Sequence, residues 1–202
     1  ILGTESMYSF LKHKVKKKIN FFNNLDNFKK IDKKKTCNII ISKSGNTLEV
    51  AANINLIIKK NDKNLIITEN RKNYLNSIVA DLKSEIIEHK NFIGGRYSVL
   101  SEVGMVPAEL MGLNTQKFKN INELIKSKNF TKSLVDSVER TIRLLKNKRF
   151  NSIILNYDSR SIKLFEWYQQ LISESLGKKS NGILPMISLM PKDNHSLMQY
   201  YL

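Results

Sequence analysis

Hydroxyl-bearing residues gather in one short stretch of the sequence, SKSGNT at residues 42–47. Ser42, Ser44 and Thr47 supply hydroxyl donors, and Gly45 lets a ligand approach the backbone closely. The stretch lies between an apolar run that predicts a strand and a pattern that predicts a helix. A helix N-terminus offers free backbone N–H groups and a positive dipole end to an anion. These residue types in this place therefore fit a phosphate-binding loop, which we call the 42–47 loop.

A second interpretation of the 42–47 loop stays open at this point. Ser, Asn and Thr also cap helices, so the stretch fits a plain N-capping turn equally well. It is not a Walker loop, because the G-x-x-x-x-G-K-[ST] spacing is absent. The sequence also leaves open whether Lys43 directs its side chain at a ligand or lends only its backbone N–H.

Two further stretches carry residues that could act on an anionic substrate. Gly94 and Gly95 precede Arg96, so the backbone can fold close to a ligand and present the guanidinium inward. The alternative is an ordinary turn with a surface arginine. Glu174 comes late in a predicted helix, and Gln170 lies four residues earlier on the same helical face. For this pair the alternative is a solvated glutamate.

Strand-like and helical patterns alternate in the first half of the chain. This alternation predicts βαβ units and an α/β fold with a parallel sheet, in which ligands bind beyond the carboxyl ends of the strands. The predicted strands are 19–23, 38–42 and 64–68, and the predicted helices are roughly 5–16, 46–60 and 71–90.

The pattern changes in the second half. A helix is predicted over 96–112, with a kink or early turn at Pro107 and an end at Gly112. Charged helices are expected from 113 to 148, and we place a domain change near 113–150, with the boundary between residues 130 and 131. A new α/β rhythm follows, with strands at 151–157 and 182–189 around a helix at 159–176.

The net charge of +16 does not by itself indicate a nucleic-acid partner. The basic residues are mostly lysines spread along the chain, and the runs at 13–18 and 29–35 lack the interleaved aromatic residues that stack on bases. We expect these runs to be solvated, and the histidines His13 and His89 to lie at the surface. A positive field would favour a small anionic substrate.

The remaining composition narrows the class of protein. No apolar run approaches the roughly 20 residues of a membrane span, so no membrane partner is predicted. Cys37 is the single cysteine, which excludes an internal disulfide and argues against a Cys-rich metal site. We expect it to be an inert, buried thiol in a cytoplasmic protein.

Together the three stretches resemble the phosphoglucose isomerase (glucose-6-phosphate isomerase) family. The family's Ser-Lys-[Ser/Thr]-x-x-Thr phosphate loop is matched by residues 42–47 and its Gly-Gly-Arg-[Phe/Tyr]-Ser signature by residues 94–98. Its Glu-Ser-x-Gly-Lys stretch is matched by residues 174–178. The final DNHSLMQYYL resembles the segment that presents a catalytic histidine, here His195. All four motifs follow the family's order over nearly the whole chain.

The resemblance implies a sugar-isomerase fold and an activity. Residues 1–130 would form a three-layer, flavodoxin-like α/β domain, and residues 131–202 the N-terminal part of a second similar domain. The reaction would interconvert glucose 6-phosphate and fructose 6-phosphate through an enediolate, in glycolysis and gluconeogenesis, without a metal or cofactor. The intact enzyme is expected to be a homodimer.

The resemblance also assigns roles. Glu174 is the base that moves the proton between the two carbons, and Arg96 steadies the enediolate charge. Gln170 binds sugar hydroxyls or phosphate, His195 assists ring opening across the dimer, and the 42–47 loop binds the substrate phosphate.

Two family features are absent. The family's Gly-Gly-Ser turn would lie just before Ile1, and its C-terminal lysine motif is not found. We therefore expect an internal fragment whose first domain lacks its leading strand, and which is inactive alone and marginally stable or prone to associate. The alternative function is a non-catalytic sugar-phosphate-binding regulatory domain of the same fold.

Overall fold

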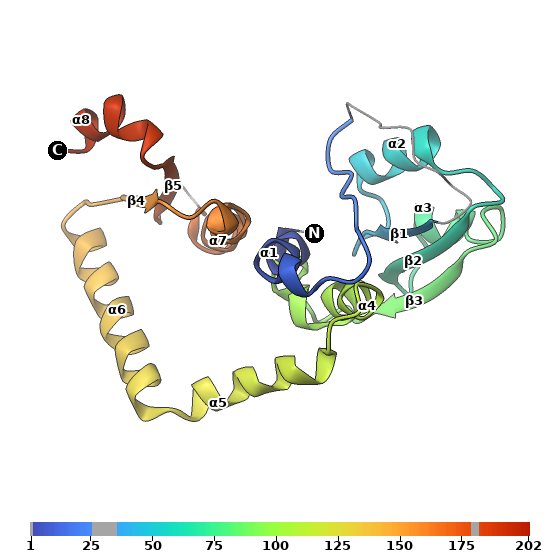
Figure 1. The fold of residues 1–202 in the computed structure, drawn as a ribbon, viewed down its shortest axis with the longest axis horizontal. Helices are drawn as coiled ribbons and strands as arrows, with labels where there is room; N and C mark the ends of the chain where they lie inside the picture. The colour runs from blue at the N-terminus through green and yellow to red at the C-terminus, as the bar shows by residue number, and fades with distance from the viewer. Residues whose placement is uncertain (1, 26–35, 179–181) are drawn as a thin grey trace. The chain divides into compact units, whose positions relative to one another are not determined.

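The computed structural model describes residues 2–25, 36–178 and 182–202 (Figure 1). The chain divides into two compact units. Residues 16–112 form the first unit, and residues 2–15 together with 113–202 form the second. The first helix of the chain therefore belongs to the second unit. The domain boundary after residue 130 stays a prediction.

The first unit is built on a parallel sheet with the strand order β1-β2-β3. Ile40 of β1 lies opposite Ile66 of β2, which in turn lies opposite Ile86 of β3. The central strand is the most buried, as expected for a strand of a parallel sheet that is covered on both faces. The strands are β1 (Cys37–Ile41), β2 (Lys63–Glu69) and β3 (Glu85–His89).

Two helices enclose the core of this unit. Ile54 of α2 (Leu48–Ile57) and Leu75 of α3 (Tyr74–Ile78) pack with Ile40 and Ile66 of the sheet. These side chains are β-branched or bulky and almost fully buried, so removing them from water stabilises the unit. The predicted strands 38–42 and 64–68 and the helix at 46–60 are thus confirmed.

The third strand corrects the prediction of one long helix over 71–90. The helix α3 ends early, Lys83 takes a left-handed conformation with φ 48°, and the chain then enters β3. The predicted strand at 19–23 is also wrong, because these residues lie outside the sheet. Instead, the carbonyl of Phe22 accepts a hydrogen bond from the side chain of Asn53 on α2.

The remainder of the first unit follows β3. A 3-10 helix, η3 (Gly95–Leu100), leads into α4 (Glu102–Leu110), where one helix was predicted over 96–112. Ser101 separates the two and caps α4 by accepting from the N–H of Val103. The helix α4 runs through Pro107, and Gly112 follows it with φ +80°.

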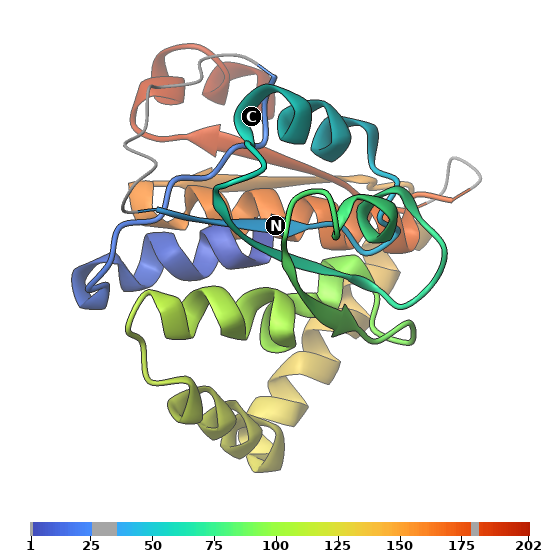
Figure 2. The ribbon, with the colours of Figure 1, turned by 90° about the vertical axis from the view of Figure 1, so that its right-hand side faces the viewer.

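The second unit contains a two-stranded parallel sheet that packs on a helix. Strand β4 (Asn151–Asn156) pairs with β5 (Leu184–Leu189), and α7 (Ile162–Leu176) contacts β5. Helix α1 (Leu2–Leu11) lies along α7 in Figures 1 and 2. The predicted helix at 159–176 and the strands at 151–157 and 182–189 are confirmed.

An ion pair ties α1 to α7. The buried carboxylate of Glu5 lies 3.2 Å from Lys163 Nζ, and Lys163 also donates to Glu166 at 2.7 Å. The bond to Glu166 is the main reason why the pKa of Lys163 is raised, and Glu5 adds to the effect. The hydroxyl of Ser9 donates to the carbonyl of Arg160 at 2.9 Å.

Helices connect the two sheets along the chain, as the sequence predicts for 113–148. The longest, α6, begins at the Ser127 cap and has no buried residue. Its apolar stripe includes Leu134, Val135, Val138 and Ile142, all of them exposed. The connecting helices are η4 (Thr115–Asn120), α5 (Ile121–Lys126) and α6 (Lys128–Lys146), and short helices elsewhere are η1 (Lys12–Lys14), η5 (Ser159–Ser161), η6 (Lys192–His195) and α8 (Met198–Tyr201).

Two predictions about single side chains are wrong. Cys37 was expected to be buried, but it opens β1 and is exposed. Partial desolvation nevertheless raises the pKa of its thiol, and the charge of Glu85 raises it further. His89 was expected at the surface, but it ends β3 and is only 1% exposed. His13 is exposed as predicted, and the lysines of the run at 13–18 are exposed too, whereas the run at 29–35 lies outside the described residues.

Candidate active site

The 42–47 loop joins the carboxyl end of β1 to the start of α2. The side-chain oxygens of Ser42 and Thr47 lie 2.7 Å apart, and Ser42 Oγ also accepts from the N–H of Gly45 at 3.2 Å. Thr47 occupies the N-cap position of α2, yet its side chain makes no capping hydrogen bond. The loop therefore differs from the plain N-capping turn that the sequence also allowed.

Contacts with the start of α3 fix the shape of the loop. Gly45 has φ +69°, and a Cβ atom at this position would lie 2.2 Å from Asn73 Cγ. Asn46 Oδ1 accepts from the N–H of Tyr74 at 2.8 Å, and the carbonyl of Gly45 accepts from the N–H of Leu75 at 3.1 Å. Glycine is thus required at position 45 by both backbone conformation and space.

Lys43 uses its side chain inside the protein. Its ammonium donates to the carbonyls of Asn91 and Ile93, each at 2.8 Å, and lies 3.4 Å from the carboxylate of Glu69. Two of the three N–H donors of the ammonium are therefore used by backbone carbonyls, and its charge is paired with that of Glu69. In this structure Lys43 connects the end of β1 to the end of β2 and to the loop after β3.

Arg96 lies just beyond that loop, in the first turn of η3. Its guanidinium carbon is 4.9 Å from the centre of the Tyr97 ring, a cation–π distance, and the side chain is half-buried. The backbone at Gly94 and Gly95 does not need a positive φ. A Cβ on Gly95 would meet nothing within 4 Å, so space is open beside the backbone there.

Gln170 and Glu174 contact one another on α7. Gln170 Nε2 donates to Glu174 Oε1 at 2.9 Å, which agrees with the predicted shared face. Glu174 lies in the last turn of the helix and is exposed. The neighbouring Gln169 donates to the carbonyl of Pro185 at 2.9 Å and holds α7 to β5.

His195 ends η6, the short helix that follows β5, and is exposed. Asp193 fixes this helix at the carboxyl end of the strand. Its Oδ2 accepts from the N–H of Leu189 at 2.7 Å and from the hydroxyl of Ser188 at 2.9 Å. His195 thus sits on a short segment that is tied to the sheet edge.

The structure groups the predicted site residues into two sets. One set, in the first unit, comprises the 42–47 loop and Arg96. The side chain of Lys43 connects the two, because it donates to the carbonyls of residues 91 and 93, shortly before Arg96. The other set, in the second unit, comprises Gln170, Glu174 and His195.

Sequence reasoning missed several residues that support the first set. Glu69, at the end of β2, is a buried carboxylate. It forms ion pairs with Lys43 and with Arg71, whose Nε lies 2.9 Å from the carboxylate. A polar residue directly after a buried strand was the signal that could have found it. His89 gave no such signal, because its partner Glu102 lies 13 residues away on another element.

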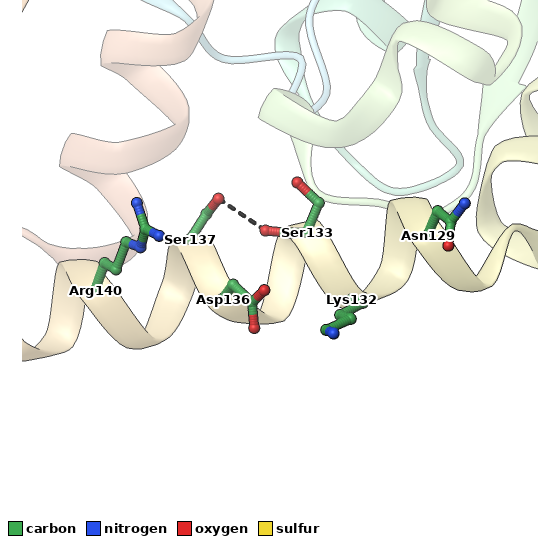
Figure 3. Close-up of a pocket in the computed structure, with 6 residues that line it drawn as sticks. All are labelled: Asn129, Lys132, Ser133, Asp136, Ser137 and Arg140. Carbon is green, nitrogen blue, oxygen red and sulfur yellow. Dashed lines mark hydrogen bonds between the residues drawn. The ribbon is translucent and has the colours of Figure 1, made fainter.

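The hollow whose residues Figure 3 shows is lined by none of these site residues. Asn129, Lys132, Ser133, Asp136, Ser137 and Arg140 line it, all of them on α6. Because one helix alone provides the lining and no predicted site residue takes part, we do not regard it as a substrate site.

None of the helices in the described residues has the length and apolar character to cross a bilayer.

Comparison with known proteins adds to this geometry. A family model described as phosphoglucose isomerase matches residues 2–184. This chain belongs to the phosphoglucose isomerase family. Glucose-6-phosphate isomerase of Methanocaldococcus jannaschii is 35% identical over 190 residues, which cover 86% of this chain and 46% of the relative. The same enzyme of Mycoplasmopsis pulmonis is 31% identical over 191 residues, which cover 84% of this chain and 43% of the relative.

A solved structure supports the fold. The crystal structure of a hypothetical protein of Thermus thermophilus matches with a TM-score of 0.72 and 22% identity, covering 99% of this chain and 53% of that one. The α/β fold with parallel sheets is therefore shared with that protein. The chain spans about half the length of the phosphoglucose isomerase relatives that it matches.

Proposed function

We propose that the intact protein carrying this chain interconverts glucose 6-phosphate and fructose 6-phosphate. Membership of the phosphoglucose isomerase family over residues 2–184 is the observation that carries this proposal. The relatives from Methanocaldococcus jannaschii and Mycoplasmopsis pulmonis bear the name of that activity. The proposal includes a homodimer and a cytoplasmic location.

The 42–47 loop takes the substrate phosphate in this proposal. Thr47 leaves the N–H groups at the start of α2 without a side-chain cap, so they remain suited to an anion. The hydroxyls of Ser42, Ser44 and Thr47 surround this position, and because Ser42 and Thr47 bond one another, one hydroxyl of that pair and that of Ser44 are left to donate to the phosphate. Lys43 contributes its backbone N–H, since its ammonium is used within the protein.

The chemical step requires a base and a fixed positive charge. Glu174 removes the proton from one carbon of the open sugar and returns it to the other, and Gln170, which contacts it, binds the sugar hydroxyls. Arg96 faces the negative charge that develops on the enediolate. Open space at Gly95 lets the substrate approach the backbone next to Arg96. His195 assists ring opening.

The 202-residue chain alone has little turnover in this proposal. It covers about half the length of its relatives, and Glu174 is exposed within it. The intact protein encloses this residue.

Proton exchange tests the proposal. The intact protein is incubated with glucose 6-phosphate in D₂O, and proton NMR follows product formation and the entry of deuterium into substrate and product. We expect fructose 6-phosphate that carries deuterium at C1, and deuterium at C2 of the glucose 6-phosphate that the reverse reaction forms again. Binding without either would instead favour the regulatory sugar-phosphate-binding domain. Binding to arbitrary DNA that weakens steeply with salt would favour a nucleic-acid partner.

A further inference from the structure

A buried histidine in the first unit has no role in the proposed chemistry. His89 ends β3, and Nδ1 of its ring contacts Oε1 of Glu102, the first residue of α4. Its other ring nitrogen, Nε2, lies 3.2 Å from the carbonyl oxygen of Ile93. The ring therefore connects a strand end, a helix start and the loop between them.

The hydrogen-bond partners hold this ring at both of its nitrogens. A backbone carbonyl can only accept, so the Nε2 of His89 donates to the carbonyl of Ile93. Glu102, which is partly exposed at the start of α4, contacts Nδ1. Lys43, which donates to the same Ile93 carbonyl, is paired with Glu69.

Two side chains, those of Lys43 and His89, thus meet at one carbonyl oxygen. Ile93 accepts from Lys43 at 2.8 Å and from His89 at 3.2 Å. Ile93 directly precedes Gly94 and Gly95, which have no side chains with which to anchor the turn that leads to Arg96. The position of the Ile93 carbonyl therefore helps to determine the position of the Arg96 backbone.

We propose that His89, paired with Glu102, is a positioning residue for Arg96, and that it acts together with Lys43 through the Ile93 carbonyl. This inference rests on the proposed function, in which Arg96 stabilises the enediolate. A displacement of about 1 Å at a reacting group can cost roughly 100-fold in rate, so a loosened anchor lowers kcat more than it raises KM.

Two substitutions of His89 by amide side chains distinguish the two hydrogen bonds that the ring makes. Asparagine places its amide nitrogen near Nδ1, so His89→Asn retains the contact with Glu102 and loses the one with Ile93. Glutamine reaches to the Nε2 position, so His89→Gln retains the contact with Ile93. The exposed His13 provides the control His13→Asn.

Steady-state kinetics of the intact protein measure the effect. We expect His89→Asn to lower kcat about 10-fold with KM changed less than about 2-fold, and His89→Gln to stay within about 3-fold of the parent. Both substitutions remove one bond, so their thermal stabilities should fall by similar amounts. Equal loss of kcat in both, or none in His89→Asn, would overturn the positioning role.

NMR of the same protein gives a readout that does not depend on the activity. In protein labelled with ¹⁵N-histidine, we expect an Nε2–H signal from His89, identified by its loss in His89→Gln. The amide signals of Gly94 and Gly95 should shift in His89→Asn and remain in His89→Gln. A ring without a proton on Nε2, or unmoved glycine signals in His89→Asn, would refute the inference. An inactive parent with the expected NMR result would refute only the isomerase function.

Discussion

Ser42 Oγ and Thr47 Oγ1 lie 2.7 Å apart, so a hydrogen bond between side chains joins the first and last residues of the 42–47 loop. Ser42 Oγ also accepts from the N–H of Gly45. When Ser42 donates to Thr47, the hydrogen of the exposed Thr47 hydroxyl is left to donate to an anion.

We predict that Thr47→Val weakens binding of glucose 6-phosphate to the intact protein about 10-fold or more, because a hydrogen bond to a charged group contributes roughly 1.5–3 kcal/mol. Valine keeps the shape of threonine and removes the hydroxyl. Thr47→Ser keeps the hydroxyl and should bind within about 3-fold of the parent. Titration calorimetry measures both, and equal affinity in Thr47→Val would exclude this hydroxyl from the phosphate site.

Gly45→Ala should destabilise the protein. Alanine at φ +69° is strained and its Cβ would clash with Asn73, which together should cost at least about 1–3 kcal/mol of unfolding free energy. Gly95→Ala is the matched control, because its Cβ enters open space and should change stability by less than about 0.5 kcal/mol. Urea unfolding compares the two. Equal stabilities would contradict the loop geometry.

The sequence predicted the elements that have strong local patterns. The isoleucine runs of β1 and β2 and the apolar stripe of α6 stand out from their neighbours. The strand β3 did not, because the apolar residues from Tyr74 to Ile87 continue at a spacing that also fits a helix. The helix α3 ends at Ile78, and the turn that follows contains Lys83 in a left-handed conformation, of which its side chain gives no warning.

The motifs of the candidate site could be found in the sequence, but not the residues that support them. Lys43 was recognised as part of the loop, yet its partners at 91–93 come from a segment almost 50 residues away. His89 looked like a surface residue, because the carboxylate that stabilises it in the interior belongs to Glu102 on another element. Such pairings are made by the tertiary fold.

The exposed thiol of Cys37 should react slowly at neutral pH. Partial desolvation and the charge of Glu85 raise its pKa, so the reactive thiolate is scarce there and accumulates as the pH rises. Glu85→Gln removes one raising cause, lowers the pKa and should accelerate alkylation by iodoacetamide at pH values below the pKa. Lys63→Gln removes a lowering cause and should slow it. Equal rates in all three proteins would refute this electrostatic account.

The 202-residue chain should self-associate, because the apolar stripe of α6 is exposed to solvent. We predict that Val138→Lys shifts the chain towards the monomer in sedimentation velocity. Ser137→Lys adds the same charge at the preceding residue, which is not part of the apolar stripe, and should leave association nearly unchanged. A chain that is already monomeric, or an equal response to both substitutions, would show that the stripe does not drive association.

The assignment of Glu174 as the base is the central claim, and the kcat of Glu174→Gln in the intact protein tests it most directly. Glutamine keeps the size of the side chain but cannot take up the proton, so kcat should fall by about 100- to 10,000-fold. Glu139→Gln, which removes an exposed carboxylate paired with Arg143 on α6, is the control and should retain the parent rate. A parent-like kcat in Glu174→Gln would contradict the account.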